Sequence, residues 1–161
     1  MRNLPSLPVQ IPVCEPTGRV QKVLLVGFQD QDNLGLRYLM STVNASGHEA
    51  SIMTYRSDAG TILQRIRHDQ PDVVGFSLIF QYMAPDFGQV IEALRDAGVT
   101  AHFTMGGHYA SFEPAEILRR IPGLDSVVRF DGEITLVKLL NCLSTGSEWR
   151  GLPGIAFRKD D

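Results

Sequence analysis

Apolar residues along the chain gather in five short runs, each ending in glycine or polar residues. The runs are KVLLVG (22–27), ASIMTY (50–55), DVVGFSLI (72–79), AHFTMG (101–106) and DSVVRF (125–130). Runs that are apolar throughout, such as DVVGFSLI, are typical of strands buried on both faces, as in a parallel sheet. The pattern therefore predicts five strands.

After each run, apolar residues recur three or four positions apart, which places them on one face of a helix. This period covers residues 36–43, 62–66, 87–94, 117–121 and 136–143. Gly47 and Gly98 stand where the first and third helices should end. The alternation predicts an α/β fold: a doubly wound, flavodoxin-like (Rossmann-like) five-strand parallel sheet with strand order 2-1-3-4-5.

The two ends of the chain differ from this repeat. Residues 1–20 contain four prolines and no helical or strand period, which indicates an irregular Pro-rich arm. Residues 21–146 make up the predicted domain. Residues 147–161 include the run PGIAFRK, which we interpret as an extra strand or the start of a linker.

The composition of the chain limits the kinds of partner and cofactor that the protein is expected to bind. The net charge is −3 and the basic residues are scattered, which argues against nucleic-acid binding. No apolar run approaches the roughly 18 residues of a membrane span, and the first residues do not resemble a signal peptide, so we expect a cytoplasmic protein. Cys14 and Cys142 lie far apart and form no metal-spaced pair, which excludes an iron–sulfur cluster bound by cysteines of this chain.

The predicted topology opens a crevice where the order reverses, at the carboxyl ends of the first and third strands. The loops at this edge are Asp30-Gln31-Asp32-Asn33-Leu34-Gly35, Ser77-Leu78-Ile79 and Gly106-Gly107-His108. The simplest interpretation of the first loop is a helix cap, because Asp and Asn are favoured there. The glycine pair would let a bulky or flat ligand approach the backbone.

Three familiar ligand classes do not suit these loops. A phosphoacceptor receiver needs an Asp where Ser77 stands, and no Lys follows the fifth strand. A flavodoxin-type phosphate loop needs hydroxyl groups, whereas residues 29–33 offer none and carry two negative charges. The dinucleotide motif G-x-G-x-x-G is missing after the first strand.

The three loops together resemble the cobalamin-binding domain family, whose fingerprint is D-x-H-x-x-G, then S-x-L, then G-G. Residues 30–35 match the first element with Asp32 in place of the histidine, and residues 77–79 match the second with Ile79 as the last residue. Gly106 and Gly107 supply the third. The intervening segments, 36–76 and 80–105, have lengths that the family shares. The resemblance implies that cobalamin is the cofactor, with its benzimidazole tail in the crevice.

In family members with the histidine, its imidazole is the lower ligand of cobalt and the aspartate orients that ring. Asp32 is a poor substitute for imidazole on cobalt. The resemblance therefore implies base-off, histidine-off binding, with Asp32 and Asn33 as helix caps or hydrogen-bond partners. His108 follows a different strand, and we expect it in a surface loop or at the edge of the cofactor. No metal ligand or catalytic residue is assigned in this chain.

Over residues 21–159 the chain is similar to the amino-terminal cobalamin domains of radical S-adenosylmethionine enzymes, notably in MGGHYASFEPAEIL and LDSVVRFDGEITLVKLL. That branch usually has G-E-G/D-E after the fifth strand, and residues 130–133 keep only Gly132 and Glu133. The resemblance implies the cofactor domain of an enzyme for methyl transfer or a related radical reaction. The 4Fe-4S cluster and S-adenosylmethionine would belong to a catalytic domain in the same parent chain, so we expect an excised domain or, less simply, a stand-alone carrier.

A second interpretation stays open, because a fold alone does not determine function: a non-enzymatic small-molecule-sensing or protein-interaction module. Under the cobalamin interpretation, the cofactor-binding residues come from the three loops, the start of the last helix and Phe80 beyond the third strand. They are Asp30, Asp32, Asn33, Leu34, Gly35, Ser77, Leu78, Ile79, Phe80, Gly106, Gly107, His108, Gly132 and Glu133.

Overall fold

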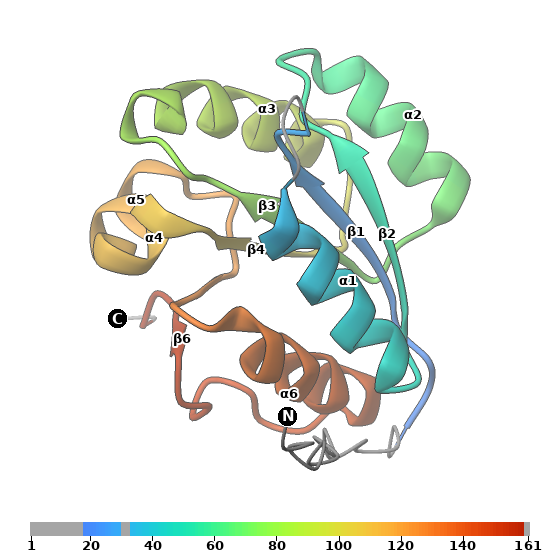
Figure 1. The fold of residues 1–161 in the computed structure, drawn as a ribbon. Coiled ribbons are helices and arrows are strands. Elements are labelled where there is room, and N and C mark those ends of the chain that lie inside the picture. Colours follow the sequence, from blue (N-terminus) through green and yellow to red (C-terminus); the bar gives the residue numbers. More distant parts are fainter. Residues whose placement is uncertain (1–17, 30–32, 160–161) are drawn as a thin grey trace, which may run out of the picture.

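A computed structural model describes residues 18–29 and 33–159. Its centre is a six-stranded sheet in the order β2-β1-β3-β4-β5-β6, in which the first five strands of the chain run parallel and β6 is antiparallel to β5 (Figure 1). The strands are β1 (Lys22–Gly27), β2 (Glu49–Thr54), β3 (Val73–Ser77), β4 (His102–Gly106), β5 (Ser126–Val128) and β6 (Ile155–Ala156).

The predicted fold class is confirmed, including the order 2-1-3-4-5 of the parallel strands. The sixth strand lies in the run PGIAFRK, where Ile155 pairs with Val128 and Ala156 pairs with Val127. The segment after this strand is tied to the end of α5, because the Arg158 guanidinium donates hydrogen bonds to the Leu118 carbonyl at 2.9 Å and the Pro122 carbonyl at 2.8 Å. The predicted arm falls almost wholly on residues 1–17, outside the described residues.

Helices follow the strands as the apolar period predicts, with one addition. They are α1 (Leu34–Ala45), α2 (Ala59–Asp69), α3 (Ala84–Asp96), α4 (His108–Phe112), α5 (Pro114–Arg120) and α6 (Gly132–Thr145), with a 3-10 turn, η1, at Gln81–Met83. The short helix α4 is not predicted by the sequence pattern. It ends where Pro114, which lacks an N–H, occupies the first turn of α5.

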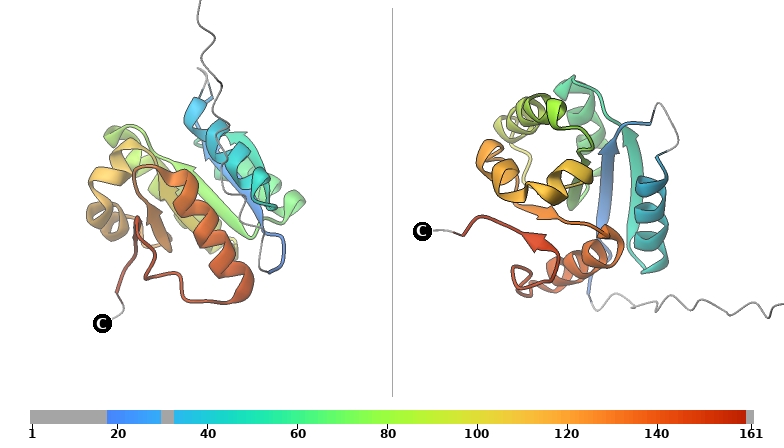
Figure 2. Two further views of the ribbon diagram at one scale, coloured as in Figure 1. Left: turned by 60° about the horizontal axis from the view of Figure 1, so that its bottom comes forward. Right: turned by 60° about the vertical axis from the view of Figure 1, so that its left-hand side comes forward.

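The helices form two layers, one on each face of the sheet (Figure 2). Helices α1 and α6 pack side by side on one face, around Val43, Leu139 and Leu140. Helices α2, α3 and α5 cover the other face, where a larger core contains Phe76, Phe87 and other buried side chains. Strand β3 contacts both layers, and Val73, Val74, Gly75 and Phe76 are all buried, as expected for a central parallel strand.

Local signals account for the position of α1. The Asn33 side chain caps the helix by accepting a hydrogen bond from the Leu36 N–H at 3.1 Å, and its amide donates to the Phe28 carbonyl at 3.0 Å. Gly27, at the end of β1, allows the helix to approach the sheet, because a Cβ atom there would lie 2.7 Å from Leu36 Cδ1. None of the helices in the described part of the chain is long and apolar enough to span a membrane.

Candidate functional site

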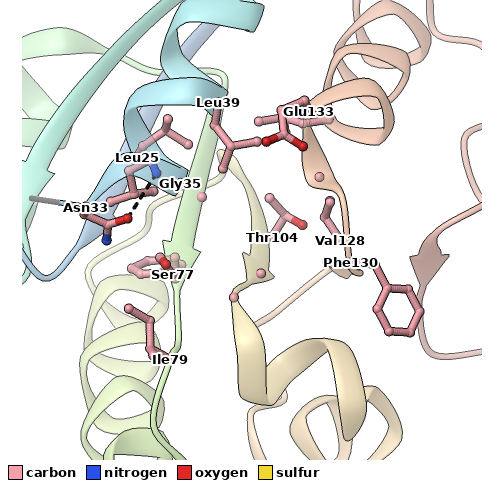
Figure 3. Close-up of a pocket in the computed structure, with 17 residues that line it drawn as sticks. Leu25, Asn33, Gly35, Leu39, Ser77, Ile79, Thr104, Val128, Phe130 and Glu133 are labelled. Atoms are coloured by element: carbon pink, nitrogen blue, oxygen red, sulfur yellow. Dashed lines mark hydrogen bonds between the residues drawn. The ribbon is translucent and has the colours of Figure 1, made fainter.

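A cleft of about 240 Å³ opens between α1 and α6, above the carboxyl ends of β1, β3 and β4 (Figure 3). This is where β1 and β3 lie next to each other and the strand order reverses, the usual ligand position in an open α/β sheet. The cleft is deep and apolar toward the sheet and carries polar groups at its rim.

The floor of the cleft is made by Leu25 on β1, Gly75 on β3 and Thr104 on β4. A Cβ atom at Gly75 would lie 3.0 Å from Leu25 Cδ2 and 3.9 Å from Thr104 Cγ2, so the absence of a side chain there keeps the floor open. The Thr104 hydroxyl accepts a hydrogen bond from Ser126 Oγ at 2.9 Å and donates to the Ser126 carbonyl at 3.3 Å. Because its hydroxyl is occupied within the sheet, Thr104 presents its methyl group to Gly75.

The two walls come from the flanking helices. Leu36 and Leu39 line the side of α1, and Leu136 lines the side of α6. Val128, at the end of β5, closes the cleft next to α6, where a Cβ atom on Gly132 would lie 3.2 Å from Val128 Cγ1. The walls are therefore aliphatic, and the space between them suits a flat apolar group.

Polar side chains stand at the rim. Ser77 ends β3, and among the residues that the structure describes its hydroxyl has no hydrogen-bond partner. Asn33 caps α1 on one side of the opening. Glu133 lies in the first turn of α6 and is the one ionisable residue among the described residues that line the cleft. Its carboxylate points from α6 toward α1 (Figure 3). Negative charge is favourable at a helix amino terminus.

The glycine pair at the end of β4 lies close to neighbouring backbone. Gly107 adopts φ +97°, and a Cβ atom there would lie 2.6 Å from the Leu78 carbonyl oxygen. A Cβ atom on Gly106 would lie 3.3 Å from the Val128 carbonyl oxygen. Both glycines border the cleft, but their missing side chains first make room for the neighbouring backbone, so they fix how closely the loops around the cleft approach one another.

The structure brings eight of the fourteen predicted residues to this cleft and places four others elsewhere. The eight that line it are Asn33, Gly35, Ser77, Ile79, Gly106, Gly107, Gly132 and Glu133. Asp30 and Asp32 lie outside the described residues.

The four remaining residues do not line the cleft. Leu78 is fully buried in the core on the opposite face of the sheet. Leu34 and Phe80 are exposed, and Phe80 stacks on Tyr82 with ring centroids 5.6 Å apart. His108 lies on α4 and is exposed at the surface, with its ring edge-on to Phe112. The sequence does not show which way each side chain in these loops faces. That direction decides which loop residues line the cleft and which do not.

Sequence reasoning missed the floor and walls of the cleft. Leu25, Leu39, Thr104 and Leu136 have the residue types of an ordinary core, so their identity carries no signal. Gly75 does carry one, because a glycine in the middle of a buried strand often marks a close approach by a ligand or another backbone. Within the described residues, no group of three or more His, Cys, Asp or Glu side chains is arranged to hold a metal ion.

Known proteins similar to this chain include methyltransferases. An uncharacterized methyltransferase of Pyrococcus horikoshii is 31% identical over 130 residues, which are 79% of this chain and 28% of that protein. A hopanoid C-3 methylase of Methylococcus capsulatus is 28% identical over 130 residues, or 80% of this chain and 25% of the methylase. The chain thus spans about a quarter of the length of these relatives.

Solved structures share the fold. The cobalamin-dependent S-adenosylmethionine radical enzyme OxsB superposes with a TM-score of 0.71 at 19% identity, over 88% of this chain and 21% of that one. A cobalamin-binding protein from Desulfitobacterium hafniense superposes with a TM-score of 0.65 at 18% identity, over 78% of this chain and 60% of that one. The model of the B12-binding domain matches residues 21–140, and the resemblance read from the three loops is thereby confirmed: this chain belongs to the B12-binding domain family.

Proposed function

We propose that this domain binds cobalamin with the benzimidazole tail in the cleft between α1 and α6 and with no histidine beneath the cobalt. We further propose that it is the cofactor domain of a radical S-adenosylmethionine enzyme for methyl transfer or a related radical reaction. The observation that carries the proposal is the open floor at Gly75, close to the Ser77 hydroxyl, which has no hydrogen-bond partner within the described part of the chain, at the point where the strand order reverses.

The residues of the cleft are suited to the cofactor's tail. Its flat aromatic base needs an apolar slot, which Leu25, Leu39 and Leu136 provide. The Ser77 hydroxyl would donate a hydrogen bond to a ring nitrogen of the buried base. Glu133 stands near the opening as an acceptor for hydroxyl or amide groups of the cofactor.

Bound cobalamin would supply a cobalt centre that carries a one-carbon group, and the residues of this chain would hold and orient it. The absence of a histidine ligand is supported by the sequence, in which Asp32 stands where the family fingerprint has histidine. Asp32 lies outside the described residues, so this part of the proposal rests on residue type. Carboxylate is a hard ligand and a poor replacement for imidazole on cobalt.

The relatives support a role within a larger enzyme. Two of them are named as methyltransferase or methylase, and OxsB is named as a cobalamin-dependent radical enzyme. The part of the relatives that this chain matches covers only about a quarter of their length. We propose that residues 21–146 form the cofactor domain and that a catalytic domain of the same parent chain supplies the iron–sulfur cluster and S-adenosylmethionine.

Reconstitution with the free cofactor tests the binding proposal. Purified protein is mixed with hydroxocobalamin, desalted and examined by ultraviolet–visible absorbance, with flavin mononucleotide in a parallel sample. The proposal predicts that corrin absorbance stays with the protein in a ratio near one cofactor per chain, and that flavin absorbance is lost. Protein that retains flavin but no corrin would instead favour a different small-molecule function on the same fold.

A further inference from the structure

The hydroxyl of Ser111 joins two loops that border the cleft. Ser111 lies on α4 and is buried, with 5% of its surface exposed. Its Oγ donates a hydrogen bond to the Gly107 carbonyl at 2.9 Å and accepts one from the Phe130 N–H at 2.8 Å. Gly107 follows β4 and Phe130 follows β5, so this single hydroxyl links the loop on one side of the cleft with the loop that leads into α6.

The link holds Phe130 in an unfavourable backbone conformation. Phe130 has φ +57°, in the left-handed region that a bulky L-residue rarely adopts because of the steric cost. Phe130 lies at the edge of the cleft, where the residue is 62% exposed, and its ring points away from Thr104 (Figure 3). Burial of the ring therefore does not explain the conformation, whereas the hydrogen bond from its N–H to Ser111 opposes the cost.

Neighbouring contacts strengthen the same link. The Nε atom of Arg129 donates a hydrogen bond to the Ser111 carbonyl at 3.2 Å, and its guanidinium carbon lies 4.7 Å from the centroid of the Phe130 ring. The two residues after this turn that line the cleft are Gly132 and Glu133, at the start of α6. The backbone at Phe130 therefore decides where the α6 wall begins.

We infer that Ser111 is a positioning residue for the cofactor cleft: through the left-handed turn at Phe130 it sets the place of the α6 wall relative to Gly107. The inference rests on the proposed function, because it names cobalamin as the ligand whose affinity depends on this wall. Without the hydroxyl, Phe130 returns to a conformation that suits its side chain, and Gly132 and Glu133 move with it. Glycine pays almost no penalty in the left-handed region, so a glycine at this position keeps the turn without the hydrogen bond.

A double-mutant cycle tests this coupling by equilibrium binding of hydroxocobalamin, at a temperature where thermal unfolding shows that all variants are folded. Ser111→Ala removes both hydrogen bonds of the hydroxyl, to the Gly107 carbonyl and from the Phe130 N–H, and is expected to weaken binding by about tenfold in the otherwise unchanged protein. In the Phe130→Gly background the same substitution is expected to weaken binding by no more than about twofold. Ser144→Ala is the matched control, because the Ser144 hydroxyl donates to the Asn141 carbonyl within α6 and has no other hydrogen-bond partner among the described residues.

Equal losses in the two backgrounds, or no loss in either, would overturn the inference. Amide hydrogen exchange of the cofactor-free protein supplies a second readout: the Phe130 N–H should be protected in the unchanged protein and exchange faster in Ser111→Ala, while amides in the centre of β3 stay equally protected. Unchanged exchange at Phe130 would also overturn it. If the unchanged protein binds no cobalamin, the proposed function fails, whereas the exchange measurement still decides whether Ser111 holds the turn.

Discussion

Gly75 and Leu25 face each other across two neighbouring strands on the floor of the cleft, and a Cβ atom on Gly75 would lie 3.0 Å from Leu25 Cδ2. The nearest atom is the flexible end of a side chain, so a larger residue at this position can be accommodated by the fold. It would occupy the space that we assign to the cofactor's tail. A larger residue at position 75 should therefore weaken cofactor binding without preventing the protein from folding.

We expect Gly75→Val to lower the affinity for cobalamin by more than about tenfold while the protein stays folded, because valine is well tolerated in strands and its side chain fills the floor. Isothermal titration with hydroxocobalamin and a thermal unfolding curve measure the two effects. Gly151→Val is the control, since no atom of the described residues other than its two chain neighbours lies within 4 Å of a Cβ there. Unchanged affinity in Gly75→Val would place the tail outside this cleft.

Asn33 is expected to stabilise the start of α1 through both ends of its amide. Asn33→Ala removes the cap to Leu36 and the hydrogen bond to the Phe28 carbonyl, and should lower the free energy of unfolding by about 1–2 kcal/mol in urea titrations. Asn33→Asp keeps the accepting oxygen and loses only the donor, so its cost should be smaller. Equal costs for the two substitutions would show that capping contributes little here.

The hydroxyl of Tyr55 is buried without a hydrogen-bond partner among the described residues. Burial, together with the nearby charge of Asp86, raises the pKa of Tyr55 to about 12. Tyr55→Phe should stabilise the protein by about 1 kcal/mol, because it removes an unsatisfied polar group and keeps the stacking on Phe87, whose ring centroid lies 3.9 Å away. Denaturant unfolding measures the change, with exposed Tyr38→Phe as the control. A loss of stability would reveal a partner for the hydroxyl.

His102 should make stability depend on pH. Burial lowers the pKa of its imidazole in the folded state; Asp125 opposes this shift, and Arg95 and Arg150 reinforce it. Folding therefore favours the neutral ring. The stability that results is present at pH values above the pKa of histidine in the unfolded chain, about 6.5, and it is lost as the pH falls below that value. The free energy of unfolding should decrease from pH 7 to pH 5, with a slope of at most about 1.4 kcal/mol per pH unit from this group.

The only tryptophan of the chain reports on this ring directly. Trp149 packs edge-on against His102 with centroids 5.1 Å apart, so its fluorescence can follow both unfolding and protonation. In His102→Gln the decrease between pH 7 and pH 5 should be smaller than in the unchanged protein. An identical pH profile for the two proteins would assign the dependence to other groups.

The sequence predicts most of the fold because the signals are redundant. The run DVVGFSLI is long and apolar enough to require burial on both faces, and the helices after it repeat their apolar residues with an unambiguous period. Strand β6 and helix α4 are short, with two and five residues, and segments of that length carry no period, so the sequence leaves PGIAFRK open between an extra strand and a linker and does not indicate α4. Their positions depend on the tertiary contacts of β5 and of the loop after β4.

The site divides in the same way. Its rim could be predicted because residues such as Ser77 and Gly107 stand at strand ends, and the topology brings strand ends together. Its floor could not, since Thr104 becomes apolar toward the cleft only because Ser126 engages its hydroxyl. The coupling through Ser111 is also invisible in the sequence, because it depends on a positive φ at Phe130, a residue type that gives no warning of it.

Electron paramagnetic resonance of the protein loaded with cobalamin in its cobalt(II) form tests the central claim most directly, because a nitrogen ligand beneath cobalt splits the cobalt lines and its absence leaves them unsplit. With the tail in the cleft and Asp32 in place of histidine, we predict a spectrum without nitrogen superhyperfine splitting. Asp32→His, which completes the family fingerprint, offers a way to introduce that splitting. Nitrogen splitting in the unchanged protein would contradict the account, since either the cofactor's own base or a histidine such as His108 would then be bound to cobalt.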